Sequence, residues 1–316
     1  MRKSFLAPAT ALLAVVLAAC SSTGATPAPS AASAAPTAAP SVAASASAAP
    51  SPTPDACAAD KLALVTPGTF TIGTDNPAFP PYFAPRTGGN TAPWDASQGD
   101  PTTGEGFESA VGYAIADKLG FAKDKVAWVV VPFANSFAPG PKPFDIDLNQ
   151  VTFTTDRTKT ADLSDGYYFG PQTVIALKAN KVATAKTIAE LQSAKFGVQV
   201  GTTSYDAITN VIKPTTETAV FDTNDAAVQA LKNKQVDAIV VDLPTAAYLT
   251  NVEIDDSTIV GQLDAGQPEH FSAVLAKGSA LTPCINTAIK ALDADGTLAG
   301  LVTKYLDFAA TPVIAP

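Results

Sequence analysis

The pattern of hydrophobic and polar positions predicts alternating strands and helices over most of the chain after residue 68. Residues 69–75 alternate apolar and polar side chains, which is typical of a half-buried strand. Residues 106–119 instead repeat apolar side chains every three or four positions, the spacing of a helix that packs one face on a core. Residues 126–131 predict the next strand, and a further alternating strand begins at residue 145.

The second half of the chain continues this alternation with shorter elements. Two extended apolar runs, 173–177 and 272–276, flank a region in which strands and helices follow one another. Such alternation predicts a mainly parallel sheet covered by helices, and therefore an α/β protein. The expected elements are helices at 187–193, from 202, at 225–233, from 244, at 282–293 and at 296–306, and strands at 196–200, 219–221 and 237–241.

Residues 1–20 form a targeting segment rather than part of the fold. Arg2 and Lys3 give a positive start, an apolar run follows, and small residues precede Cys20. The ending LAAC at 17–20 resembles a bacterial lipobox, which implies cleavage before Cys20 and a diacylglyceryl thioether on its sulfur. The alternatives are an ordinary secretory signal, or an uncleaved anchor, with an incidental cysteine.

Residues 21–56 consist almost entirely of Ala, Pro, Ser and Thr. Such a segment cannot bury enough apolar surface to offset the entropy of ordering it. Its repeated prolines oppose the helix that its alanines would otherwise favour. We expect a disordered tether that holds a lipid-anchored domain away from the bilayer.

Composition limits the partners of the folded part. The 316 residues are 47% hydrophobic and 16% charged, enough for one large core or two medium ones. The formal net charge of −9 makes nucleic acid a poor partner, because there is no surplus of Lys and Arg to neutralise phosphates. After the leader, no run of about 18 apolar residues predicts a transmembrane helix.

One stretch places a charged side chain at the end of a strand. The strand that begins at residue 145 runs into a Thr-rich turn that presents Arg157, whose planar fork suits both oxygens of a carboxylate. Taken alone, an arginine after a strand is more often a surface or salt-bridge residue. The spacing from Thr152 to Arg157, followed by ADLSDGYY at 161–168, resembles the signature of the family 3 extracellular solute-binding proteins, the amino-acid receptors of ABC importers.

The resemblance covers essentially residues 57–308 and implies a two-lobed periplasmic-binding-protein type II fold. In that fold two Rossmann-like lobes are joined by two crossing strands, here the two apolar runs described above. Lobe 1 is expected to comprise residues 57–170 and 270–316, and lobe 2 residues 171–269. Two crossings make a hinge, so the lobes can close on a ligand.

The resemblance also implies a site for the two charges of an amino acid. Arg157, Thr152 and the helix start at Thr202 and Thr203 would hold the α-carboxylate. Asp242, which ends an apolar strand, would pair with the α-ammonium group. The residues themselves leave a simpler role open, since Thr202 and Asp242 also suit helix caps.

The rest of the implied site follows two strand ends. Prolines keep residues 76–83 out of helices and central strands, and ligands of open α/β sheets bind at the carboxyl ends of strands. By the resemblance, Phe79 and Phe133 would sandwich the ligand, although Phe79 alone also suits a core position. The candidates for contacting the ligand's side chain are Asp75, which also suits a plain turn, Asn76 and Gln150.

The cysteines predict a covalent link within the folded part. If Cys20 is lipidated, Cys57 and Cys284 form an even pair in an exported, disulfide-permissive protein, and we predict a bond between them. The bond would clip the start of the folded chain to its C-terminal helical region. The alternative is two independent buried thiols.

Two further features have more than one interpretation. The Gly/Pro-rich loop 84–105 is long, and its Trp94 either covers the cleft mouth or packs the loop onto the surface. His270, the single histidine, lies in an expected crossing strand, which suits a hinge residue better than a general base. Without a nucleophile and base pair or metal-ligand spacing, we expect no enzyme, no cofactor and no metal.

These expectations combine into an extracytoplasmic receptor. It would bind an amino acid between its lobes, deliver it to an ABC permease, and remain as a monomer on the outer face of the cell membrane through Cys20. Asp75 favours polar or cationic ligand side chains over acidic ones. Two other functions stay open on the same fold: a lipoprotein that senses a ligand and signals through a partner, and an enzyme like the few dehydratases of the family.

Overall fold

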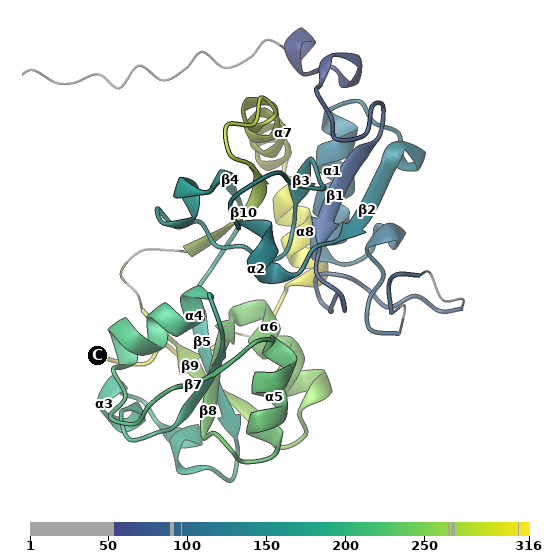
Figure 1. Ribbon diagram of the computed structural model, residues 1–316. Helices are drawn as coiled ribbons and strands as arrows, with labels where there is room; N and C mark the ends of the chain where they lie inside the picture. The colour runs from purple at the N-terminus through teal and green to yellow at the C-terminus, as the bar shows by residue number, and fades with distance from the viewer. Residues whose placement is uncertain (1–53, 89–91, 96, 265, 267–268, 309) are drawn as a thin grey trace, which may run out of the picture. The chain divides into compact units, whose positions relative to one another are not determined.

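Figure 1 shows the computed structural model, which describes residues 54–88, 92–95, 97–264, 266, 269–308 and 310–316. The expected leader, its lipidation site Cys20 and the tether up to residue 53 lie outside the described residues. The last tether positions, 54–56, belong to the 3-10 turn Pro54–Cys57, so regular structure begins three residues earlier than expected. Among the described helices, none is long and apolar enough to cross a membrane.

The first sheet has five strands in the order β2-β1-β3-β10-β4 (Figure 1). β1 runs parallel to β2 and β3, whereas β10 runs antiparallel to β3 and β4. The strands are β1 Phe70–Thr74, β2 Val126–Val130, β3 Ile146–Asp147, β4 Ala161–Gly170 and β10 Glu269–Ala276.

The helices of the first lobe bury the stripe that the sequence predicts. Phe107, Val111 and Ile115 are fully enclosed and pack with Phe70 and Ile72 of β1 in one hydrophobic cluster. This core fixes the direction in which β1 ends and hence the position of the loop that follows it. The helices are α1 Phe107–Lys118, α2 Phe133–Ser136, α7 Thr282–Ala294 and α8 Thr297–Tyr305.

The second sheet has the order β7-β6-β8-β5-β9. β6 runs parallel to β7 and β8, whereas β5 runs antiparallel to β8 and β9. Each sheet is therefore mixed. The expected parallel pairing holds for β2-β1-β3 and for β7-β6-β8. The other pairs are antiparallel, because β10 and β5 follow the connections between the sheets and run against their neighbours. β9 was not predicted from the sequence. The strands are β5 Gln172–Leu177, β6 Phe196–Gln199, β7 Ala219–Phe221, β8 Ala238–Asp242 and β9 Ser257–Gln262.

Hydrophobic clusters form on both faces of the second sheet. Successive residues of a strand point to opposite faces, so Val174 of β5 packs with Val198 and Ile208, and Ile175 packs with Leu231 in a separate cluster. Strands and helices alternate as expected, and the predicted α/β class is confirmed. The helices are α3 Ile188–Leu191, α4 Thr203–Ala207, α5 Asn224–Lys232 and α6 Leu243–Tyr248, with π-helical turns Ile208–Ile212 and Leu249–Glu253 after α4 and α6.

A disulfide joins Cys57 to Cys284, which are 227 positions apart, and this confirms the predicted pair. Their Cα atoms are 5.5 Å apart. Cys57 ends the first 3-10 turn and Cys284 lies near the start of α7, and both side chains are buried in the first-lobe core. The bond therefore clips the beginning of the described chain to the C-terminal helices.

The last residues of the chain pack on the second sheet. Gln262 of β9 donates its N–H to the carbonyl of Pro312 at 2.8 Å and accepts from the N–H of Ile314 at 2.9 Å. Ile314 is buried in this lobe, and Gly261 leaves space for it, because a Cβ there would lie 2.7 Å from Ile314. We expected residues 270–316 to belong to lobe 1, but in the structure residues 312–314 pack on lobe 2. Besides the two crossing strands, the chain connects the sheets a third time after α8.

The loop that contains Trp94 packs on the first lobe. Trp94 is buried and belongs to the same cluster as Phe107. The loop is joined to the end of β1 by a hydrogen bond of 2.9 Å from the Asn76 amide to the carbonyl of Pro93. Of the two roles considered for Trp94, packing the loop is the one that the structure has.

Candidate functional site

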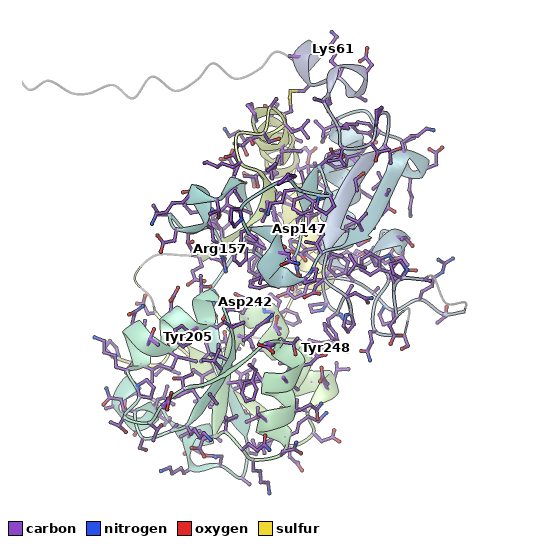
Figure 2. The ribbon with its side chains drawn as sticks, in the orientation of Figure 1. Lys61, Asp147, Arg157, Tyr205, Asp242 and Tyr248 are labelled. Carbon is purple, nitrogen blue, oxygen red and sulfur yellow. A yellow bond between two sulfur atoms is a disulfide. The ribbon has the colours of Figure 1, made fainter. Side chains whose placement is uncertain are left out.

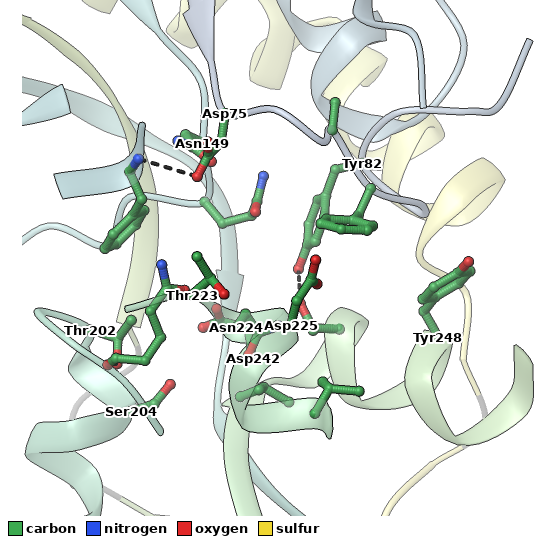
Figure 3. A pocket seen from close by; sticks show the side chains of 18 of the residues that line it. Asp75, Tyr82, Asn149, Thr202, Ser204, Thr223, Asn224, Asp225, Asp242 and Tyr248 are labelled. Carbon is green, nitrogen blue, oxygen red and sulfur yellow. Dashed lines mark hydrogen bonds between the residues drawn. The ribbon is translucent and has the colours of Figure 1, made fainter. Parts of the chain in front are cut away.

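A pocket is lined by residues of both lobes where β1, β6 and β8 end (Figure 3). Ligands of open α/β sheets bind at these carboxyl ends. The structure brings together in this pocket all ten residues that the sequence assigned to ligand binding, although they span positions 75 to 242. They are Asp75, Asn76, Phe79, Phe133, Gln150, Thr152, Arg157, Thr202, Thr203 and Asp242.

Arg157 is held in place by backbone carbonyls and aromatic rings. Its side chain donates to the carbonyl of Thr152 at 2.5 Å and to that of Gly201, in the other lobe, at 2.8 Å. The guanidinium carbon lies 4.5 Å from the ring centre of Phe137 and 5.6 Å from that of Phe133. Burial lowers the pKa of Arg157 to about 10, so the group remains a cation at neutral pH. The two bonds leave further guanidinium N–H groups for an anion.

Asp242 lies at the end of β8 (Figure 2), and the charge of its carboxylate interacts with that of Arg157. Within the described chain, its side chain does not cap α6; one oxygen instead accepts from the Gln172 amide at 2.8 Å. Burial, with the negative charge of Glu269, raises the pKa of Asp242 to about 7, against the opposing effects of Gln172 and Arg157. The simple cap role that the sequence left open is therefore not the one found.

The two threonines of the α4 start differ in their bonding. The hydroxyl of Thr202 caps α4 by accepting from the N–H of Tyr205 at 3.3 Å, as the sequence allowed. The hydroxyl of Thr203 lies 3.3 Å from that of Thr152 and 2.9 Å from Glu269. Thr203 thus takes part in the polar network of the pocket, whereas Thr202 shapes the turn.

Sequence reasoning missed the polar residues that support this network. Gln172, the first residue of β5, places its amide nitrogen within 3.2 Å of Thr203, 2.8 Å of Asp242 and 2.9 Å of Glu269. Its oxygen accepts from Ser204 at 2.6 Å. The available signal was its position directly after Gly-Pro at the start of a crossing strand.

Five aromatic residues line the pocket among those described, and three of them bear on the predicted site. Phe79 and Phe133 are half-buried, and both were predicted. Tyr82, which was not singled out, is 2% exposed and shares a hydrogen bond of 3.0 Å with the hydroxyl of Thr245 in the other lobe (Figure 3). Burial raises the pKa of Tyr82 well above its usual value, so its hydroxyl stays protonated.

The three residues expected to contact a ligand side chain have different surroundings. Asp75 accepts from the N–H groups of Asn76 at 2.8 Å and Phe133 at 3.2 Å, and burial raises its pKa. The Asn76 amide is bound to the loop of Trp94, as described above. The Gln150 amide bonds to the buried carboxylate of Glu108. All three line the pocket, but the two amides are engaged elsewhere.

Two buried carboxyl groups lie close enough to this region for their charges to interact with it. Glu108 of α1 accepts from the Tyr167 hydroxyl at 2.5 Å and from the Gln150 N–H at 2.8 Å, and burial raises its pKa to about 7. Asp147 of β3 is fully enclosed, and among the described residues neither of its oxygens has a hydrogen-bond partner. Burial, with the charges of Glu108 and Asp75, raises the pKa of Asp147 to about 8; Ser136, which is near but not in hydrogen-bonding geometry, and the charge of Lys142 oppose the effect.

Residues 86–308, more than half of the chain, match the family model of the bacterial extracellular solute-binding proteins, family 3. L-cystine-binding protein TcyJ of Escherichia coli K12 is 29% identical over 165 residues, which are 52% of this chain and 60% of that protein. The chain therefore spans less than two thirds of TcyJ. A probable histidine-binding protein of Campylobacter jejuni is 28% identical over 69% of this chain and 82% of its own length.

A solved structure also resembles this one. It is the ancestral amino acid-binding protein AncCDT-1, described as a precursor of cyclohexadienyl dehydratase. It shares 27% identity at a TM-score of 0.61 and covers 76% of this chain and 96% of its own. The predicted two-lobed type II fold is confirmed by this likeness. The chain belongs to the bacterial extracellular solute-binding proteins of family 3.

Proposed function

We propose that this protein binds an amino acid between its lobes and delivers it to an ABC importer. The observation that carries the proposal is the presence in one pocket of a buried cation, Arg157, and a carboxylate, Asp242. A free amino acid carries the two complementary charges on one carbon atom. The relatives named for cystine and histidine binding support an amino acid as the ligand class.

In this proposal each group of pocket residues contacts a different part of the ligand. Arg157, with the hydroxyls of Thr152 and Thr203, binds the α-carboxylate, and Asp242 accepts from the α-ammonium group. Phe79, Phe133 and Tyr82 enclose the ligand and exclude water, which strengthens the charged contacts. Charge-assisted hydrogen bonds of about 1.5–3 kcal/mol each are sufficient, after the costs of association, for micromolar or tighter binding.

The anchoring and the partner are parts of the same proposal. The protein is held on the outer face of the membrane by a lipid on Cys20, acts as a monomer and transfers its ligand to a permease. Mass spectrometry of the N-terminal peptide from membranes should find an acylated Cys20, and a Cys20→Ser variant should appear in the soluble fraction. Retention of that variant on membranes would contradict the lipid anchor.

We also propose that the protein is a receptor and not an enzyme. The single histidine, His270, stacks on the ring of Phe153 and contacts the tilted ring of Phe169, with the ring centroids 5.3 Å apart in each pair. It does not line the pocket. Formation of any product from a bound ligand over hours would contradict this part of the proposal.

A thermal-shift screen of the full chain against the proteinogenic amino acids tests the central claim. A ligand that binds only the folded protein stabilises it by RT ln(1 + [L]/Kd), so one amino acid or a small group should raise the melting temperature. Calorimetry on the hits then gives stoichiometry and affinity. If protein freed of co-purified ligand responds to no amino acid, the proposal fails.

A further inference from the structure

Three carboxylates line the pocket in addition to Asp242: Asp75, Asp225 and Glu253. Asp75 follows β1 in the first lobe. Asp225 lies in the first turn of α5, and Glu253 ends the π-helical turn after α6, so both belong to the second lobe. Figure 3 shows Asp75 and Asp225 reaching the same pocket from different lobes.

These carboxylates form an electrostatic group separate from that of Arg157. Asp225 keeps an exposed side chain, yet desolvation by its neighbours, together with the charge of Asp75, raises its pKa. Burial raises the pKa of Glu253, and the charge of Asp225 adds to the effect while Lys232 opposes it. The charges that act on Arg157 are instead those of Asp242, Asp206 and Glu269.

The three carboxylates form no salt bridge in the described part of the protein, although the charge of Lys232 acts on Glu253. None of them takes part in an ion pair there, and Arg157 is the one basic side chain among the described residues that line the pocket. Because Asp75 and Asp225 belong to different lobes, their repulsion opposes closure of the lobes. A positive group between them would remove that opposition.

Asn149 adds a further polar side chain to this wall of the pocket. It follows β3, the strand that pairs with β1, and it lines the pocket together with Asp75 (Figure 3). Its side chain is 5% exposed, and its amide nitrogen lacks a hydrogen-bond partner within the described residues. With Asp75 and Asn149 side by side in its lining, this wall is polar, and an apolar ligand side chain would be a poor occupant because it would desolvate these groups without bonding to them.

The spread of the carboxylates favours an organic cation. In the residues that the structure describes, no cluster of His, Cys, Asp or Glu is placed to hold a metal ion. A guanidinium or ammonium group at the end of a flexible side chain has several N–H donors and can reach more than one carboxylate. We propose that the bound amino acid has a cationic side chain and that its positive group lies between Asp75 of the first lobe and Asp225 of the second. This inference rests on the proposed function, whose ligand class it narrows.

Isosteric ligand pairs test the charge directly. Calorimetry on the full chain, freed of co-purified ligand, would compare arginine with citrulline and lysine with norleucine. Each pair has a similar shape but differs in side-chain charge. We expect the cationic member to bind roughly 10- to 100-fold more tightly, the range of one or two charge-assisted hydrogen bonds.

Two variants of one segment test the position of the cation. Asp225→Asn should weaken arginine binding roughly 10-fold or more while changing citrulline binding less than about threefold. Asp222→Asn removes the same charge at an exposed position two residues before the α5 start and should leave both affinities unchanged. Melting temperatures of both variants show that they fold.

The outcomes separate this inference from the proposed function. Binding of neutral amino acids as tightly as arginine overturns the cation assignment and leaves the amino-acid receptor intact. A cation preference that survives Asp225→Asn overturns the bridging position. Absence of binding by every amino acid overturns both proposals.

Discussion

The hydroxyl groups of Tyr82 and Thr245, 163 positions apart in the chain and in different lobes, share a hydrogen bond of 3.0 Å. A second hydrogen bond between the lobes joins the side chain of Arg157 to the carbonyl of Gly201. Both bonds exist only when the lobes are together, and both are made at the pocket. Ligand affinity therefore includes the stability of these contacts between the lobes, in addition to direct contacts with the ligand.

The Tyr82 bond can be removed without changing the ring. Tyr82→Phe keeps the edge contact with Phe271 but should weaken ligand binding about fivefold, the effect of about 1 kcal/mol. Thr245→Val should have a similar effect. In a double-mutant cycle measured by calorimetry, the second substitution should add little to the first. Fully additive losses would show that the bond does not contribute.

Arg157 should be indispensable for binding but not for folding. Arg157→Ala should weaken amino-acid binding by a factor of roughly 100 or more, because at least two charge-assisted hydrogen bonds are lost. Lys159→Ala, in the same turn but with a side chain 70% exposed, is the matched control and should bind normally. Micromolar affinity in a folded Arg157→Ala protein would remove the proposed carboxylate clamp.

The raised pKa of Asp242 predicts pH-dependent binding. With a pKa of about 7 before binding, the carboxyl is increasingly protonated below neutral pH, and a protonated carboxyl cannot pair with an ammonium group. Affinity should therefore fall by roughly 30-fold from pH 8 to pH 5.5, with proton release on binding. Two other charged groups, Glu269 and Arg157, act on Asp242. They contribute to its pKa before binding but do not reverse the direction of the pH dependence.

Asp242→Asn gives the control for this pH dependence. The variant should bind weakly at every pH between 5.5 and 8, with a flatter profile than the wild type. It should also affect ammonium-bearing ligands far more than their deaminated analogues. Calorimetry in two buffers of different ionisation enthalpy measures the released proton, and equal pH slopes in both proteins would assign the titration to another group.

Asp147 should lower stability at high pH. Its pKa is raised from 3.8 to about 8, so folding favours the protonated form, and stability should be lost as the pH rises towards 8. Asp147→Asn should stabilise the protein at pH 8 by about 1–3 kcal/mol, with a smaller gain at pH 5. Denaturant unfolding at the two pH values measures the difference.

Asp145, two residues before Asp147, is a buried carboxylate whose oxygens do have hydrogen-bond partners. Both of its carboxylate oxygens accept backbone N–H groups, from Val65 at 2.8 Å and from Thr71 at 2.7 Å. Asp145→Asn would place an amide N–H against one of these donors and should destabilise the protein. If both asparagine variants changed stability in the same direction, unmet hydrogen bonding at Asp147 would not be the cause.

The fold and the site were predictable from the sequence to different degrees. Periodicity gave the strands and helices, and polar residues at strand ends indicated Asp75, Arg157 and Asp242, because strand ends converge in an α/β fold. Gln172 and Glu269 escaped prediction, since their role depends on how two crossing strands lie beside each other, which no local pattern encodes. The partners of the Asn76 and Gln150 amides, a loop carbonyl and the buried Glu108, could not be predicted because they are distant in the sequence.

The packing of the C-terminal segment on the second lobe could not be predicted for a similar reason. Ile314 is an isolated apolar residue in a short tail, where neither helical nor strand periodicity can be recognised. Its burial depends on Gly261, more than 50 positions earlier, whose missing side chain leaves the space. Only the tertiary structure brings the two together.

The pairing of this tail with Gln262 has a thermodynamic consequence for the whole folded part. The chain leaves β9, supplies β10, α7 and α8 to the first lobe, and returns to the strand that it left. Melting of either lobe therefore removes chain that the other needs, so the two should unfold in one cooperative transition, with equal calorimetric and van't Hoff enthalpies. Truncation after Phe308 removes the segment that pairs with Gln262. It should split the calorimetric peak in two, because the lobes would then melt as separate domains.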